Sequence, residues 1–340
     1  MPTILLGMGN PLLDISAEVP QEVLDKYELK LDSAILAEEK HLPLYKELVD
    51  AYKVQYIAGG ATQNAIRVAQ WMSQTPGSTS FFGCIGKDDF GAELQNCAKA
   101  DGVNAFYKED PETPTGTCAV LVKDGERSLC ANLAAANKFT ADHLASVKAK
   151  EMIAEAKMFY IASFFLTVSV ESLLVVADHA VEHNKIFAMN LSAPFLIQFF
   201  AEPMAQALPY TDYVFGNESE ATAYGELQGW GTDIPTIALR LAAAPKKSGT
   251  RPRVVVFTQG SEATVVAKEG QVEKFPVEML EKDKLVDTNG AGDAFVGGFL
   301  SVLMRKEGAA MEECVRAGHW ASRVIIQRSG CTFPKECDYK

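Results

Sequence analysis

The stretch LVDTNGAGDAFVGGFL, Leu285–Leu300, joins a glycine-rich turn to an apolar helix, and Asp293 lies where the glycines give way to the apolar run. Gly290 and Gly292 permit backbone dihedral angles that other residues avoid, so NGAG can curl with successive amides facing one cavity. The unpaired N–H groups and the positive dipole end of the following helix favour an anion in that cavity. The stretch therefore predicts an anion hole at the N-terminus of a helix.

Asp293 beside such an anion hole suits phosphoryl transfer. A carboxylate there can accept the proton of an alcohol that attacks phosphorus, while the amides disperse the charge that the phosphoryl group gains. The alternative is that Asp293 only caps the helix and the glycines form a tight turn, and the stretch alone favours neither reading. The Walker motif GxxxxGK[ST] is absent from the sequence, and GMGNPLLD lacks the glycine spacing of a dinucleotide fingerprint.

Composition indicates a globular chain that does not bind nucleic acid or membranes. The 340 residues are 48% hydrophobic and 22% charged, and the net charge of −12 disfavours nonspecific binding to polyanions. No run of about 18 apolar residues occurs, so no transmembrane helix is expected. Seven cysteines without a CxxC pair and an N-terminus without a secretory pattern predict a cytoplasmic protein, with the nucleus as the alternative.

Strands alternate with helices along most of the chain, which predicts an α/β fold with a central, mainly parallel sheet flanked by helices. Apolar runs predict strands at 3–9, 54–58, 79–86, 157–165, 186–192, 212–217 and 253–260, and hairpins at 116–133 and 262–277. Helical spacing predicts helices at 20–29, 37–53, 89–102, 170–184, 218–227, 234–245, 291–308 and 311–330.

Two insertions interrupt this alternation, at residues 14–58 and 112–131. They predict a small α/β lid over the strand ends. The remaining ranges, 1–13, 59–111 and 132–340, are expected to form a large α/β nucleotide-binding domain.

Three further polar turns follow predicted strands, at residues 59–64, 216–221 and 257–260. Ligands of open α/β sheets bind beyond the carboxyl ends of the strands, so these turns are expected to meet at one site. Asn64 is placed to hydrogen-bond a ligand. Glu220 could orient water around Mg²⁺, which favours carboxylates and retains water.

Together these segments resemble the ribokinase-like carbohydrate kinases of the PfkB family. DTNGAGDAF is similar to the C-terminal signature of that family, GG followed by Asn to its N-terminal signature, and NESE to its NxxE magnesium motif. The segments GMGNPLLDIS, AGGATQNAIRVAQWM, PTGTCAV, RSLCANLAAAN and GCTFP are similar to the eukaryotic branch of the family that phosphorylates adenosine. The resemblance covers nearly the whole chain.

The resemblance implies a ribokinase-like fold and Mg²⁺-dependent transfer of the ATP γ-phosphoryl group to the 5′-hydroxyl of adenosine. The products would be AMP and ADP, a step of purine salvage. The expected partners are small molecules only, and the expected state is a monomer. Ala61 and Ala34 depart from the pattern, because serine and glutamine are common at these positions.

The resemblance also assigns roles to residues. Asp293 would be the catalytic base, Arg127 would approach the transferred phosphate with the lid, and the anion hole would comprise Gly290, Ala291 and Gly292. Adenosine would be bound by Asn10, Asp14, Gly59, Gly60, Asn64, Leu129, Phe165 and Asn289. ATP would contact Asn217, Thr258 and Gly260, and Glu220 would hold Mg²⁺ through water.

Alternatives remain for individual residues and for the function. Arg127 could be a solvated charge, Phe165 an ordinary core residue and Glu220 a surface helix residue. A kinase acting on another nucleoside or on a free sugar is one rival function. A nucleoside-binding regulator without catalysis is another, although such a protein has no need of the base in GAGD.

Overall fold

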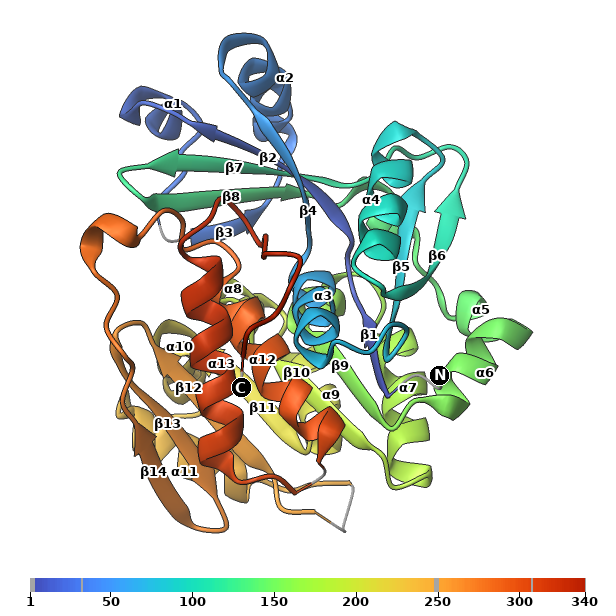
Figure 1. Cartoon of the computed structure of the whole chain (residues 1–340), viewed down its shortest axis with the longest axis vertical. Coiled ribbons are helices and arrows are strands. Elements are labelled where there is room, and N and C mark those ends of the chain that lie inside the picture. Colours follow the sequence, from blue (N-terminus) through green and yellow to red (C-terminus); the bar gives the residue numbers. More distant parts are fainter. Residues whose placement is uncertain (1–3, 32, 248–250, 307, 340) are drawn as a thin grey trace.

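The computed structural model describes every residue except 1–3, 32, 248–250, 307 and 340. Residue 32 falls in the predicted lid and the others in the predicted large domain, so at these positions those predictions lie outside the described residues. The chain builds a nine-stranded sheet and a five-stranded sheet (Figure 1).

The nine-stranded sheet follows the order β14-β13-β12-β11-β10-β9-β1-β5-β6. Neighbouring strands from β12 to β6 pair in parallel, whereas the pairs β12–β13 and β13–β14 are antiparallel. This confirms the predicted mainly parallel sheet. The strands are Leu5–Met8 (β1), Thr79–Gly86 (β5), Asn104–Asp110 (β6), Met158–Ala162 (β9), Ile186–Asn190 (β10), Tyr213–Asn217 (β11), Val254–Gln259 (β12), Glu262–Lys268 (β13) and Gln271–Phe275 (β14).

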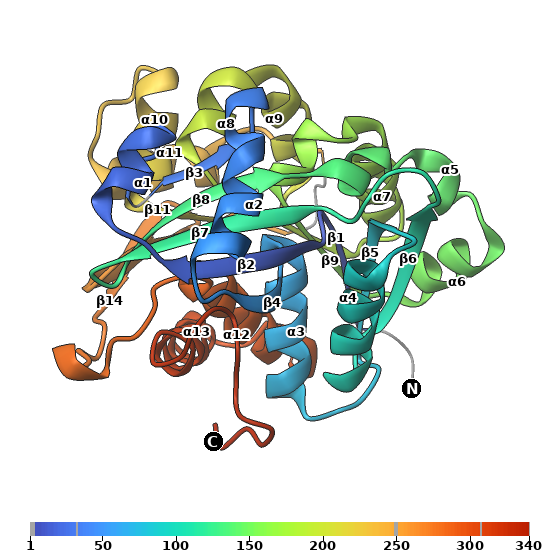
Figure 2. The ribbon, with the colours of Figure 1, turned by 90° about the horizontal axis from the view of Figure 1, so that it is seen from above.

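Helices cover both faces of this sheet, as the view from above shows (Figure 2). The central strands are buried along most of their length because helices pack on each side, which is why their sequences are continuous apolar runs. One face carries α3 (Ala61–Ser73), α4 (Asp89–Ala100), α12 (Ala291–Arg305) and α13 (Met311–Ile325). The other carries α5 (Ala141–Leu144), α6 (Val147–Glu155), α7 (Val170–Glu182), α8 (Pro194–Phe199), α9 (Ala201–Ala207), α10 (Glu218–Leu227) and α11 (Ile234–Ala243).

The five-stranded sheet lies across one end of the large sheet, with two helices on its outer side (Figures 1 and 2). Its order is β3-β8-β7-β2-β4, and β2 pairs in parallel with β7 but antiparallel with β4. The strands are Leu12–Glu18 (β2), Ser33–Leu36 (β3), Gln55–Gly59 (β4), Thr117–Lys123 (β7) and Glu126–Asn132 (β8). The helices are α1 (Gln21–Lys26) and α2 (Leu42–Ala51), and they enclose a small apolar core of their own.

Several local predictions differ from the structure. The strand predicted at 157–165 ends at Ala162, and Ser163–Thr167 forms a 3₁₀ helix, η3. Strands β2, β3 and β6 were not expected. Within the described residues, no helix combines the length and the apolar character that crossing a membrane requires.

Candidate active site

The glycine-rich stretch forms the turn into α12 that the sequence predicts. Gly290 is the N-cap residue with a φ of 78°, and α12 begins at Ala291. A Cβ on Gly290 would lie 2.9 Å from the Cβ of Cys331, so both the backbone angle and the close approach require glycine there. The N–H groups of the first helical turn have no partner within the helix, which leaves the amide of Gly292 available to an anion. The Ala291 N–H differs from the prediction, because it already donates to the Thr288 carbonyl at 3.2 Å.

Asp293 lies in the first turn of α12 and does not cap the helix. The N-cap is Gly290, which has no side chain, so the reading of Asp293 as a simple N-cap is wrong. The Asn64 side-chain amide on α3 donates to Asp293 Oδ2 at 3.0 Å. Burial raises the pKa of Asp293 to about 7, and the hydrogen bond from Asn64 acts in the opposite direction. Such a carboxylate can gain and lose a proton near neutral pH.

A second carboxylate, that of the buried Asp14, faces the same site from β2, whereas Asp293 is half-buried. Asp14 is 6% exposed, and the Asn289 side-chain amide lies at hydrogen-bonding distance of its Oδ2, 3.5 Å away. Burial and then the field of Asp293 raise the pKa of Asp14 to about 7. A Cβ on Gly59 would collide with the Asp14 carboxylate, so glycine at this position makes room for it.

The turn after β4 is shaped by Gly60, whose φ is 94°. A Cβ at this position would collide with the carbonyl oxygen of Asn10, so the chain segments of Asn10 and Gly60 approach each other closely. The Asn10 amide group donates to the Phe164 carbonyl at 3.2 Å. The Asn10 and Asn64 side-chain oxygens are buried without a hydrogen-bond partner among the described residues. Unpaired buried acceptors are rare, and hydroxyl groups of a ligand would satisfy them.

Arg127 on β8 is buried in an ion pair with Asp287, so the reading of Arg127 as a solvated charge is wrong. Leu129 follows two residues later and therefore lies on the same face of the strand. Its side chain is half-buried. The structure thus places Arg127 close to the loop that leads into the anion hole.

Phe165 lies in η3 and is enclosed in the core, where its ring meets Phe139 at 5.4 Å. Its contact with a base stays a prediction. The neighbouring Phe164 is only half-buried, and its carbonyl accepts the Asn10 amide. Sequence reasoning passed over Phe164 because nothing in the apolar run distinguishes the two rings.

The polar turns after β11 and β12 meet as predicted. A cavity of about 50 Å³ unites them with the first turn of α12, and its lining comprises Asn190, Phe215, Gly216, Asn217, Glu220, Val256, Thr258, Gly292, Phe295 and Val296. Gly260 does not contribute to this lining and is exposed in the turn between β12 and β13. Asn190, at the end of β10, is a polar residue that the sequence reading missed.

Glu220 is buried rather than a surface helix residue. It is 5% exposed and forms a capping box with Asn217, in which each side chain accepts the backbone N–H of the other residue at 2.9–3.0 Å. Burial raises the pKa of Glu220 to about 7, although backbone N–H groups lower it. The carboxylate therefore has a structural role even without a ligand.

Within the described part of the chain, no group of three His, Cys, Asp or Glu side chains could hold a metal ion by itself. Glu220 lines the same cavity as Gly292 at the start of α12. This carboxylate fits Mg²⁺ that would take most of its ligands from phosphate oxygens and water.

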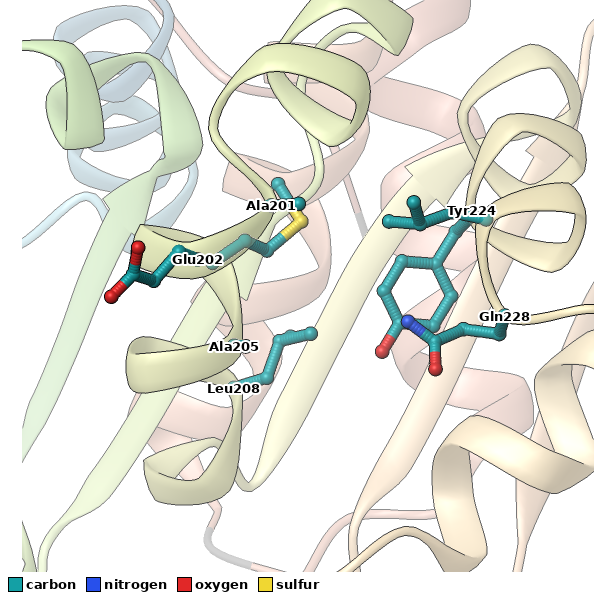
Figure 3. Close-up of a pocket in the computed structure, with 8 residues that line it drawn as sticks. Ala201, Glu202, Ala205, Leu208, Tyr224 and Gln228 are labelled. Atoms are coloured by element: carbon teal, nitrogen blue, oxygen red, sulfur yellow. The ribbon is translucent and has the colours of Figure 1, made fainter.

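A larger cavity, of about 310 Å³, lies between α9 and the C-terminal end of α10 (Figure 3). Its lining is Ala201, Glu202, Met204, Ala205, Leu208, Tyr224, Leu227 and Gln228, none of which the sequence predicted for the site. The glycine turns and the two aspartates lie elsewhere, so this cavity is not the candidate active site.

A mainly parallel sheet flanked by helices, with a glycine turn and an aspartate at the start of α12, is the arrangement of the ribokinase-like class of kinases. The chain belongs to the pfkB family of carbohydrate kinases, which it matches over residues 23–337.

Relatives and solved structures support this assignment over the whole chain. The chain is 57% identical to adenosine kinase 1 of Arabidopsis thaliana, over 99% of this chain and 97% of that protein. Anopheles gambiae adenosine kinase, solved in complex with P1,P4-di(adenosine-5) tetraphosphate, matches at 48% identity with a TM-score of 0.96 over 100% of both chains. Schistosoma mansoni adenosine kinase, solved with adenosine in an occluded loop conformation, matches at 37% identity with a TM-score of 0.93 over 98% of both chains.

Proposed function

We propose that this protein transfers the γ-phosphoryl group of ATP to the 5′-hydroxyl of adenosine, giving AMP and ADP. The observation that carries the proposal is the juxtaposition of Asp293, hydrogen-bonded by Asn64, with the turn of Gly290 and Gly292. Proteins named adenosine kinases that match nearly the whole chain support adenosine as the acceptor. Purine salvage is the corresponding cellular role.

Adenosine binds between the two sheets in this proposal. Asp14 accepts hydrogen bonds from the ribose hydroxyls, and Asn289 holds that carboxylate in place. The unpaired buried oxygens of Asn10 and Asn64 accept further hydrogen bonds from the nucleoside. The ranges 14–58 and 112–131 then act as the lid, and enclosing the substrate between lid and large domain excludes water that would hydrolyse ATP.

Asp293 takes the proton of the 5′-hydroxyl as that oxygen attacks phosphorus. The amides of Gly290 and Gly292 disperse the negative charge that develops on the transferred group. Asn217 and Thr258 contact the nucleotide phosphates. Glu220 would hold Mg²⁺ through water, and the ion would supply positive charge that offsets the charge of the phosphates. We further propose that the protein acts as a monomer in the cytoplasm.

The test is ADP release with Mg-ATP and a panel of adenosine, inosine, guanosine, cytidine, ribose and fructose. We expect turnover with adenosine, and Asp293→Asn should lower kcat by about 10²–10⁴-fold because the base is lost. Asp233→Asn is the matched control, since Asp233 only caps α11 on the surface and should retain turnover.

Each other outcome identifies a rival. Turnover with ribose or fructose alone would mean a sugar kinase that uses the same machinery. Saturable adenosine binding without any turnover would mean a regulator. An Asp293→Asn protein that folds, binds adenosine and keeps the wild-type kcat would refute the assignment of the base.

A further inference from the structure

We propose that Asp287 is a positioning residue that fixes Arg127 beside the anion hole, ready for the phosphoryl donor. This inference rests on the proposed function, and Asp287 is a residue to which the sequence assigned no role. Asp287 is 2% exposed, so its carboxylate must be compensated by the protein.

The carboxylate of Asp287 joins three segments that are far apart in the sequence. Its Oδ1 accepts the backbone N–H of Asn289 at 2.5 Å and the Nε–H of Arg127. Its Oδ2 accepts the backbone N–H of Gly330 at 2.6 Å. One side chain therefore ties β8 of the smaller sheet and the C-terminal segment to the loop that becomes the anion hole.

The C-terminal segment is itself anchored. The ring of Phe333 stacks on Trp71 of α3 at a centroid distance of 5.0 Å. Gly330 therefore offers its N–H from a fixed position, and Asp287 has little freedom to move away from Arg127.

The Arg127 guanidinium is buried but incompletely satisfied. The side chains of Arg127 and Asp287 are 4% and 3% exposed. Arg127 Nη1 finds no hydrogen-bond acceptor among the described residues. Burial lowers the pKa of Arg127, and Asp287 acts against that shift. A buried cationic N–H group without an acceptor, next to an anion hole, is suited to a phosphoryl oxygen.

A second buried ion pair shows what a satisfied arginine looks like in this chain. Arg67 contacts Asp101 at 2.6 Å, and its Nη1 also donates to the carbonyls of Ala58 and Cys331 at 3.1 and 3.3 Å. The Nε and Nη1 groups of Arg67 therefore both have acceptors, unlike Nη1 of Arg127. The pair of Arg67 and Asp101 provides a control for the loss of a buried ion pair.

A double-mutant cycle tests the inference with Asp287→Asn, Arg127→Gln and the double variant. We would measure kcat, the KM values for ATP and adenosine, the ATP affinity by calorimetry and the thermal unfolding midpoint. Each single variant should lower kcat/KM for ATP about a hundredfold. The double variant should be no worse than Arg127→Gln, because Asp287 acts through Arg127. Asp101→Asn should lower the unfolding midpoint but leave kcat and both KM values near those of the wild type.

Multiplied losses in the double variant would overturn the inference, because Asp287 would then act independently of Arg127. An Asp287→Asn protein that loses only thermal stability would do the same. A wild-type protein that phosphorylates no acceptor would refute the proposed function instead. In that case the double-mutant cycle is evaluated from the ATP affinities. Non-additive losses of ATP affinity support the inference, and additive losses overturn it.

Discussion

The proton affinity of the Asp293 carboxylate is set by two opposing features of its surroundings. Burial raises its pKa to about 7, and the amide of Asn64 partly offsets that effect by stabilising the charged form. Only the deprotonated carboxylate can accept the substrate proton. We therefore expect kcat/KM for adenosine to rise with pH through about 7 and then level off.

Asn64→Leu should move this limb to higher pH. The variant removes a hydrogen bond to the charged carboxylate, and a loss of about 1.5 kcal/mol corresponds to a shift of about one pH unit. The measurement is the pH profile of kcat/KM for adenosine. Ser301→Ala, which removes a buried hydroxyl elsewhere on α12, should leave the midpoint in place. A midpoint that is unchanged or lower in Asn64→Leu would contradict the role of this hydrogen bond.

Residue types make Asp293 and Asn64 candidates, because carboxylates and amides beside glycine turns can bind a ligand. The family resemblance then favours Asp293 as the base over the helix cap and assigns a role to Asp14. The same reasoning misses Asp287, which lies in the same stretch as Asp293. The role of Asp287 depends on Arg127 and Gly330, which are distant in the sequence, and no local pattern shows tertiary partners. Its position in a mostly apolar, glycine-rich segment was the available signal, since a buried carboxylate needs a partner.

At the scale of elements, two glycines at the junction between the glycine turn and α12 should have different effects on the stability of the protein. Gly290 has a positive φ and would contact Cys331, whereas a Cβ on Gly292 meets nothing within 4 Å. Gly290→Ala should lower the free energy of unfolding by about 1–2 kcal/mol, the cost of a left-handed conformation for an L-residue. Gly292→Ala should fold at least as stably as the wild type, because alanine is favoured over glycine in helices.

Gly292→Ala should lose activity although it keeps its stability. Gly292→Ala should lower kcat at least about tenfold, because its methyl group occupies the space that the proposal gives to the phosphoryl group. Urea unfolding and steady-state turnover of both variants provide the measurements. Full activity in Gly292→Ala would place the phosphoryl group elsewhere, and wild-type stability in Gly290→Ala would contradict the turn geometry.

The elements that the sequence predicted share strong local signals. The hairpin of β7 and β8 turns at Asp124 and Gly125, both with positive φ, as the sequence indicates. Strand β2 was missed although Leu13–Glu18 alternates between apolar and polar residues, and the structure buries both sets of side chains except at the end of the strand. Strand β6 is a polar edge strand, and β3 has only four residues. Pairing with distant strands, and not local composition, makes these segments strands.

At the scale of the whole molecule, the candidate site lies where the two sheets meet. Asp14 and Arg127 come from the five-stranded sheet, whereas Asn289 and Asp293 come from the loop and helix on the large sheet. A nucleoside held by both groups stabilises their association. Opening of the smaller sheet away from the large one would then have to break contacts with the ligand.

Amide hydrogen exchange measures this coupling. At an adenosine concentration of 100 times the Kd, binding adds about 2.7 kcal/mol to any opening that destroys the site, so exchange through such openings should slow about 100-fold. We expect this protection in β2, β4 and β8. The hairpin of β13 and β14 at the far edge of the large sheet can open without disturbing the site, so its exchange should not change.

The pattern of protection decides between three descriptions of the molecule. Protection confined to α12 and its preceding loop would mean that the five-stranded sheet does not hold the nucleoside, and the proposed lid would be wrong. Equal protection of every strand would mean that exchange occurs only through global unfolding. Protection of the smaller sheet with an unchanged β13–β14 hairpin would show that adenosine links two units, each with its own core, since Ile15, Val23 and Leu44 pack within the smaller unit alone.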